Sequence, residues 1–166
     1  MPAAGQVYAG SRLTAAMLQG VAPLSAYKGT SQPVTSSTTL VNDGALAIEL
    51  QANAVYSFIL VLGYNGASGA GNLKFGWALP SGSTMGYSLY GNTTGGSATD
   101  GPWETASSVP ALGTSGTGTS LGAVAQGTVS TGSTQGPMQL QWAQNSSSST
   151  ATTVLAGSVL LAWQVQ

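Results

Sequence analysis

The sequence predicts an all-β protein, a two-sheet antiparallel β-sandwich that is jelly-roll-like, with an extended N-terminal arm. Three observations predict it. Short segments alternate apolar and polar residues with period 2, glycine-, serine- and asparagine-rich turns separate these segments, and 166 residues suit one domain. Counting the weaker segments gives roughly eight to nine strands, which favours a sandwich over a closed barrel.

Two regions divide the chain, an anchoring arm over residues 1–36 and a β-sandwich domain over residues 37–166. The first region has no period-2 pattern. It contains Pro2, Pro23 and Pro33, and each proline disfavours a helix at the residue before it. We therefore expect an extended arm.

One short helical turn is predicted inside the arm, over residues 13–19, because Ser11 suits its N-cap and Gly20 its C-cap. Apolar residues of the arm have no nearby partners in the sequence, so we expect them to dock on another surface. These candidate anchoring residues are Leu13, Met17, Leu18, Val21, Leu24 and Tyr27.

The first half of the domain contains the clearest strands. Residues 46–51 alternate as a half-buried strand does, after a tight turn predicted at Asp43 and the glycine that follows it. Residues 54–64 are apolar on both faces, which predicts a strand covered on both sides. A glycine-rich turn at 65–72 then joins this strand to residues 73–79 in a predicted hairpin.

The second half continues as strands around one long, glycine-, serine- and threonine-rich stretch, residues 91–120. We expect that stretch to be an exposed crossing with one short edge strand, which a jelly roll tolerates between its halves. The remaining predicted strands cover residues 85–90, 121–130, 137–143, 150–155 and 158–165.

Charge is scarce. Only 4% of residues are charged, against roughly 25% in ordinary soluble domains. The three cations, Arg12, Lys28 and Lys74, are spread over three regions, so we expect neither nucleic-acid binding nor binding to an anionic membrane. The apolar runs are also shorter than the roughly 20 residues of a membrane-spanning helix. Because a nearly uncharged surface has little colloidal repulsion, we expect a component of a larger assembly.

The residues that usually carry catalysis are missing, since the chain has no cysteine and no histidine. No cluster of acids suits a metal, so we expect no metal, no cofactor and no enzymatic activity. Asp100 and Glu104 flank Trp103 and leave one catalytic alternative, a glycan hydrolase with paired carboxylates. A structural turn with a packed aromatic residue is the favoured interpretation of this segment.

Aromatic residues near the glycine-rich segments suggest a contact site, because such rings stack on sugars or pack in subunit interfaces. Alternation assigns Tyr87 to the core. Tyr90 and Trp103 are the candidate exposed contacts, with a subunit interface favoured over a surface glycan.

Longer strings carry a family resemblance. They are TTLVNDGALAIELQANAVYSFILVLGYNG, then Phe75, Trp77 and Pro80 in an F-x-W-x-x-P segment, then GPMQLQWAQNSSSSTATTVLAGSVLLAW, and together they span most of residues 38–163. In these strings the chain resembles virion proteins of tailed phages that infect actinobacteria, including minor tail proteins and capsid-decorating proteins. The resemblance implies a structural or adhesive β-domain, often trimeric.

The function expected from this resemblance is that of a capsid decoration protein, because the chain is short and has one domain. The arm would bind the outer surface of the major capsid protein shell, and a homotrimer would stabilise that shell. The alternative is a minor tail or tail-fibre protein that binds a host receptor or glycan. The first residues lack the features of a signal peptide, so we expect synthesis in the host cytoplasm and a final place on the capsid exterior.

Overall fold

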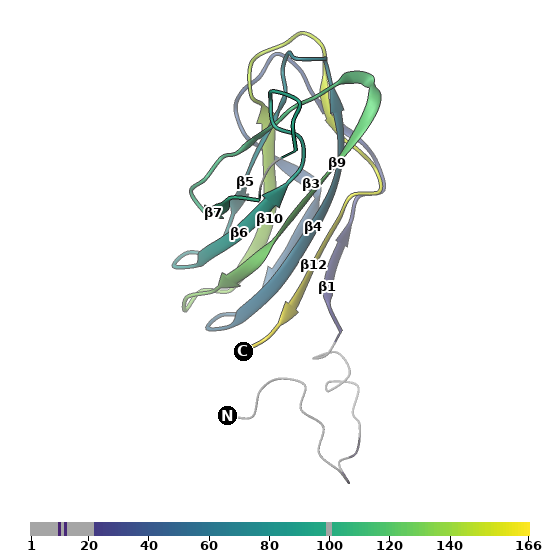
Figure 1. Cartoon of the computed structure of the whole chain (residues 1–166). Helices are drawn as coiled ribbons and strands as arrows, with labels where there is room; N and C mark the ends of the chain where they lie inside the picture. Colours follow the sequence, from purple (N-terminus) through teal and green to yellow (C-terminus); the bar gives the residue numbers. More distant parts are fainter. Residues whose placement is uncertain (1–9, 11, 13–21, 99–100) are drawn as a thin grey trace.

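Two antiparallel sheets face each other in the computed structural model, which describes residues 10, 12, 22–98 and 101–166 (Figure 1). The large sheet contains, in order, β1 (Leu24–Tyr27), β12 (Val159–Gln164), β4 (Val55–Gly66), β9 (Gly116–Ser130), β6 (Thr84–Tyr90) and β7 (Trp103–Thr105), and β11 (Thr152–Val154) joins β2 (Gln32–Val34) to β4. The small sheet contains, in order, β3 (Val41–Leu50), β10 (Gly136–Gln144), β5 (Leu73–Ala78) and β8 (Ala111–Leu112). The predicted all-β sandwich is confirmed.

Strands β3 to β10 pair as one nested hairpin. β6 pairs with β7, β5 with β8, β4 with β9, and β3 with β10, each pair enclosing the one before it. Rolling this ribbon places β3, β10, β5 and β8 in one sheet and β4, β9, β6 and β7 in the other. This is the strand order of a jelly roll, and it confirms the predicted topology.

The core lies between the inner faces of the two sheets, where alternate residues of each strand are buried. Four aromatic rings meet at its centre: Phe58 and Tyr87 from the large sheet, and Phe75 and Trp77 from the small sheet. Phe58 and Trp77 pack edge to face, with ring centroids 5.4 Å apart. Such pairs contribute about 0.5–1.5 kcal/mol beyond their buried area, so they help to hold the two layers together.

A buried ion pair joins the large sheet to the small one. Lys28, which follows β1, is 2% exposed, and its Nζ lies 2.8 Å from Oδ2 and 2.9 Å from Oδ1 of Asp43 in β3. The carboxylate also accepts hydrogen bonds from the backbone N–H groups of Ala45 and Leu46 and from the Trp142 indole. The pair is therefore fully hydrogen-bonded, as a buried ion pair must be.

Part of the predicted arm belongs to the sandwich. Residues 24–27 form β1, which pairs with β12, and residues 32–34 form β2, which pairs with β11 alone. Pro33 fits there because a proline cannot donate to a second neighbouring strand. Among the candidate anchoring residues, Leu24 packs against the chain's own core and Tyr27 is exposed. The predicted helical turn and the other four, Leu13, Met17, Leu18 and Val21, lie outside the described residues.

Three sequence predictions about local structure are wrong. The tight turn expected at Asp43 lies inside β3, because the Asp43 side chain is bonded to Lys28 and to nearby backbone within the strand. Residues 65–72 do not close a hairpin, since β4 and β5 belong to different sheets. The expected crossing contains two short strands, β7 and β8, and β9 begins at Gly116 instead of residue 121.

Only one face of β4 is buried within the chain, although both faces are apolar. Its inner residues are in the core, whereas Val61 on the outer face is 42% exposed. The prediction of a strand covered on both sides is therefore met only on the inner face of this single chain. The outer face of the large sheet is left open.

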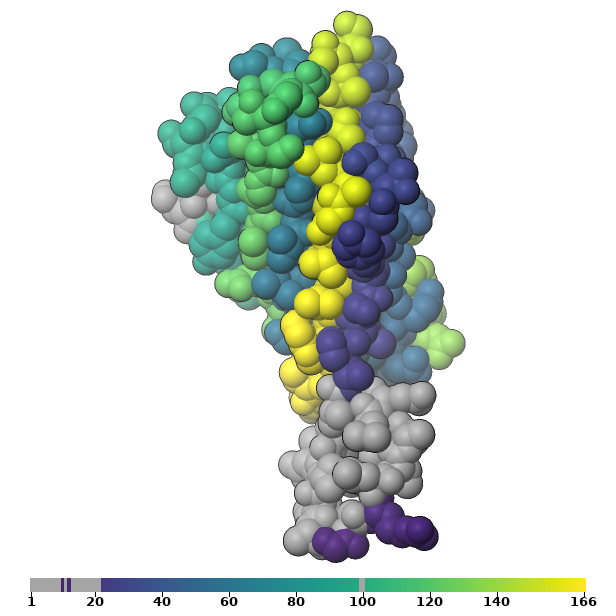
Figure 2. Space-filling view, turned by 90° about the vertical axis from the view of Figure 1, so that its right-hand side faces the viewer, coloured from purple at the N-terminus to yellow at the C-terminus, as the bar shows by residue number. Residues whose placement is uncertain are grey.

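The chain enters and leaves the sandwich at one end. Leu24, the first residue of β1, pairs with Ala162 near the end of β12, and Val55 donates its N–H to the carbonyl of Gln166. Figure 2 shows β12 (yellow) running beside β1 (dark purple). Residues 22–98 and 101–166 contain no helix that could cross a membrane. We call the end with Leu24 and Gln166 the base.

Candidate functional site: the outer face of the large sheet

Three rows of side chains cross the outer face of the large sheet. The row furthest from the base is entirely apolar, and strand register aligns its members from β1 to β6. We call it the apolar row: Tyr27, Val159, Val61, Val124 and Tyr90. Tyr27, Val61 and Tyr90 are exposed and the other two are half-buried, so the row lies open to a partner.

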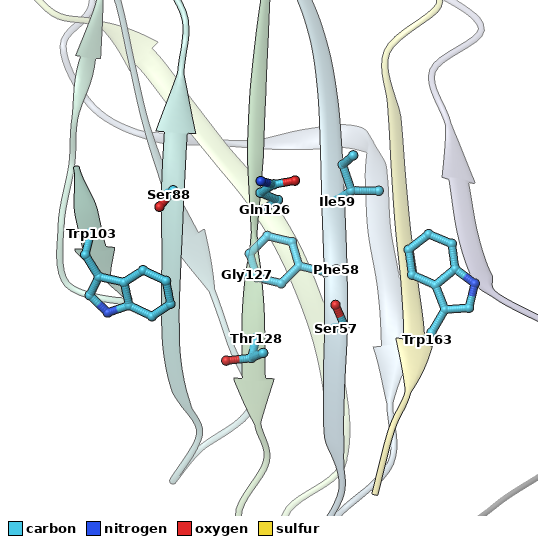
Figure 3. Close-up of a pocket in the computed structure, with 9 residues that line it drawn as sticks. All are labelled: Ser57, Phe58, Ile59, Ser88, Trp103, Gln126, Gly127, Thr128 and Trp163. Carbon is cyan, nitrogen blue, oxygen red and sulfur yellow. The ribbon is translucent and has the colours of Figure 1, made fainter. Parts of the chain in front are cut away.

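The other two rows form a shallow groove of about 480 Å³ nearer the base. Figure 3 shows a tryptophan at each side of it, Trp163 from β12 and Trp103 from β7. Polar side chains lie between them, together with Phe58 and Ile59. The groove is lined by Ser57, Phe58, Ile59, Ser88, Trp103, Gln126, Gly127, Thr128 and Trp163.

Trp103 is held over a neighbouring strand by a glycine. Its register partner on β6 is Ser88, but its indole leans over Gly86, where an added Cβ would lie only 2.8 Å from the ring carbon Cε2. Aromatic residues often cover a cross-strand glycine in this way. One face of the indole is thus packed, while the side chain remains 67% exposed.

Tyr90 is directed elsewhere. Its ring packs on Gly101, where an added Cβ would lie 2.6 Å from the ring carbon Cζ. Tyr90 and Trp103 are both exposed, but Tyr90 belongs to the apolar row and Trp103 to the groove. Tyr87 is buried in the core, as its place in the alternation predicts.

No charged side chain among the described residues faces the groove. Glu104 is next to Trp103, but it pairs in register with the inward-facing Tyr87. Burial, and secondarily the Glu104 carboxylate, raise the pKa of Tyr87 well above its ordinary value. Lys74 and Glu49 lie on the outer side of the small sheet. The described lining of the groove therefore carries no charged side chain.

Polar side chains in the groove are free to bind a ligand. Ser57, Ser88, Gln126 and Thr128 make no side-chain hydrogen bond with the described residues. The glutamines of β10 differ from Gln126, because each is bonded to other residues of the chain: Gln139, Gln141 and Gln144.

The described residues do not bring together the predicted pair of carboxylates or a metal site. Asp100 is outside them, and Glu104 is half-buried beside the core. In the described part of the chain no three histidine, cysteine, aspartate or glutamate side chains gather as a metal site would require. Trp163, which sequence reasoning did not single out, is 39% exposed. Its alternation with buried Leu160 and Ala162 was the available signal, but it does not say which face of a strand is open.

Comparison with known proteins gives weak likenesses. No protein-family model matches the chain, and no curated protein matches it. A chain in the solved structure of the Gx strain of infectious bursal disease virus has 10% sequence identity to this chain and a TM-score of 0.26. The alignment covers 88% of this chain and 36% of that one. A chain of the VP2 subviral particle of the same virus has 9% identity and a TM-score of 0.20. The alignment covers 87% of this chain and 42% of that one.

The chain spans about two fifths of those viral proteins or less. The likeness is weak, and it is to proteins of a virus particle. The assignment to the jelly-roll class of β-sandwiches rests on the strand order alone, because TM-scores this low carry no argument.

Proposed function

We propose that the chain is a non-enzymatic structural protein of a phage virion, a capsid decoration protein that sits on the outside of the major capsid protein shell as a homotrimer. The resemblance over residues 38–163 to virion proteins of actinobacterial phages supports the virion assignment. The apolar row supports a role in packing against other subunits, and it is the observation that carries the proposal.

The apolar row is suited to a subunit contact. It crosses five neighbouring strands, which at about 4.8 Å per strand spacing gives a length of about 19 Å. All five members are tyrosine or valine, and interface cores are rich in aromatic residues and poor in charge. Around a closed symmetry axis each copy would present this row to its neighbour. This also accounts for the apolar outer face of β4.

The anchoring role falls on the part of the arm before β1. Leu24 already packs on the chain's own core, and Tyr27 belongs to the apolar row. The proposed contacts with the capsid are therefore made by Leu13, Met17, Leu18 and Val21. Because β1 begins at the base, this arm would join the sandwich there and leave the opposite end facing outward.

The anchoring proposal is tested in the full chain. A Met17→Asp, Leu18→Asp double variant is expected to lose binding to undecorated capsids in co-sedimentation, while its far-ultraviolet spectrum stays that of the wild type. Val109→Asp, at an exposed residue in the loop after β7, is the control. Undiminished binding by the double variant would remove the arm from the proposal.

Location is tested by immunogold electron microscopy of intact virions. Label over the head is the expected result. Label confined to the tail would overturn the decoration assignment in favour of the minor tail alternative.

The trimer is tested by light scattering at micromolar concentration. Wild-type protein is expected at three times the chain mass of 16.4 kDa. Val61→Asp should give monomers, because it places a charge in the middle of the apolar row. Val109→Asp is a matched control, since Val109 is 46% exposed and Val61 42%. A monomeric wild type, or a trimeric Val61→Asp, would contradict the proposed interface.

A further inference from the structure

We propose that the groove between Trp103 and Trp163 binds a neutral oligosaccharide, which stacks on both indoles and hydrogen-bonds to the polar floor between them. This inference goes beyond the decoration function, because it concerns a ligand of the isolated chain. It does not depend on where in the virion the protein sits.

One cross-strand row of residues sets the length of the ligand. Trp163 pairs in register with Ser57, Ser57 with Thr128, and Thr128 with Gly86, which the Trp103 indole covers. The two indoles therefore lie at the ends of one straight row. Three strand spacings separate them, about 14 Å. A single sugar ring is too small to contact both, whereas a chain of several rings follows the row.

The side chains along the groove match the two kinds of group that a sugar presents, C–H faces and hydroxyls. Indole faces carry negative charge density and attract the C–H groups on the face of a sugar ring. Between the indoles, the hydroxyls of Ser57, Ser88 and Thr128 and the amide of Gln126 each both donate and accept hydrogen bonds, as sugar hydroxyls do. These groups have no bonding partner among the described residues, so they are available to the ligand.

Charge selects the class of sugar. No cation among the described residues lines the groove, so an acidic or phosphorylated sugar would find no partner for its charge. A second protein subunit fits less well here, since interface cores are closely packed and poor in polar groups, whereas this floor sets four polar side chains beside Ile59 between separated rings. The apolar row has the opposite character. The outer face thus divides into a contact for protein and a contact for sugar.

Binding is tested with the full-length protein and three neutral linear probes: maltohexaose, cellohexaose and chitohexaose. Tryptophan fluorescence titration and calorimetry are the readouts. At least one hexasaccharide is expected to bind at millimolar concentration or below, and at least tenfold more tightly than its monosaccharide. The expected upper limit is a concentration of about 1 mM. If none of the three hexasaccharides binds even at about 10 mM, the proposal is overturned.

Variants locate the site. Trp103→Ala and Trp163→Ala are each expected to weaken binding at least tenfold, whereas Val109→Ala, at an exposed residue outside both the groove and the apolar row, leaves it unchanged. Gly86→Val keeps both tryptophans but occupies the seat of the Trp103 indole, and should weaken binding as well. Full binding by both tryptophan variants would overturn the site.

A protein contact at the groove is distinguishable from a sugar site. If Trp103→Ala or Trp163→Ala changes the mass measured by light scattering, with no sugar present, the groove belongs to a subunit interface and the sugar proposal fails. If the mass is unchanged and sugar affinity falls, the proposal is supported. Thermal melting of each variant checks that the sandwich remains folded.

Discussion

Replacing Lys28 with methionine is expected to lower the free energy of unfolding by about 3–5 kcal/mol, because it leaves the buried Asp43 carboxylate without its counter-charge. The Lys28 ammonium makes two hydrogen bonds to that carboxylate and one to Gln32. Methionine fills a similar volume but makes none of them. The same pair at the surface would contribute only about 0–1 kcal/mol.

Burial of the ion pair is the reason to expect the larger loss, about 3–5 kcal/mol, instead of the surface value of about 0–1 kcal/mol. Neither side chain of the pair reaches solvent to any extent, at 2% and 0% exposure, so water cannot replace the lost ammonium. In Lys28→Met the carboxylate keeps three donors, the backbone N–H groups of Ala45 and Leu46 and the Trp142 indole. These donors limit the loss but carry no full charge.

Urea unfolding followed by tryptophan fluorescence at pH 7 measures the effect. Lys74→Met is the matched control, since Lys74 is half-buried and forms no ion pair with a described residue, and its change should stay within about 0.5 kcal/mol. In a double-mutant cycle, Lys28→Met with Asp43→Asn should cost less than the sum of the two single changes. A loss below about 1 kcal/mol for Lys28→Met would refute the argument.

Three further predictions concern the sandwich itself. Gly127→Ala should lower the free energy of unfolding by about 1–3 kcal/mol or more, because the new Cβ would lie 2.6 Å from the Tyr87 Cα. Gly122→Ala on the same strand places its Cβ near no other atom and should leave the stability unchanged, and the urea midpoints of the two variants test this difference. Tyr87→Phe should cost little, since the buried hydroxyl makes no hydrogen bond of normal geometry with the described residues. Tyr64→Phe loses a bond to the Gly113 carbonyl and should cost about 0.5–1.5 kcal/mol in the same assay. Burial raises the pKa of both tyrosines above 10.0, so stability should be complete below pH 10 and fall as the pH rises above it, less steeply in Tyr87→Phe; a pH-independent unfolding free energy between pH 9 and 11 would contradict this.

Period-2 patterns predicted the long strands because alternation is a local property. Segments such as residues 46–51 and 85–90 alternate with two clearly different faces, and they lie in β3 and β6. Strands β1 and β2 have four and three residues, too few to show a pattern, so the sequence alone places residues 24–34 in the arm.

Features that depend on distant partners could not be predicted. Asp-Gly is a strong turn signal, but Asp43 stays within β3 because Lys28, 15 residues earlier, neutralises it. The groove is a similar case. The sequence predicts Trp103 as an exposed aromatic contact, but Trp163 joins it only because β12 pairs with β4, and that pairing brings Trp163 opposite Ser57.

The nested pairing of β3 to β10 has a consequence for how the chain folds. The innermost pair, β6 with β7, is close in sequence, whereas the outermost, β3 with β10, joins Leu50 to Gly136. Each successive pair joins residues further apart in the sequence than the last, so we expect slow folding, on the order of milliseconds to seconds, that proceeds outward from the β6–β7 pair. β1 pairs only with β12, at the far edge of the finished ribbon. During synthesis β1 would therefore wait, unpaired, until β12 has been made.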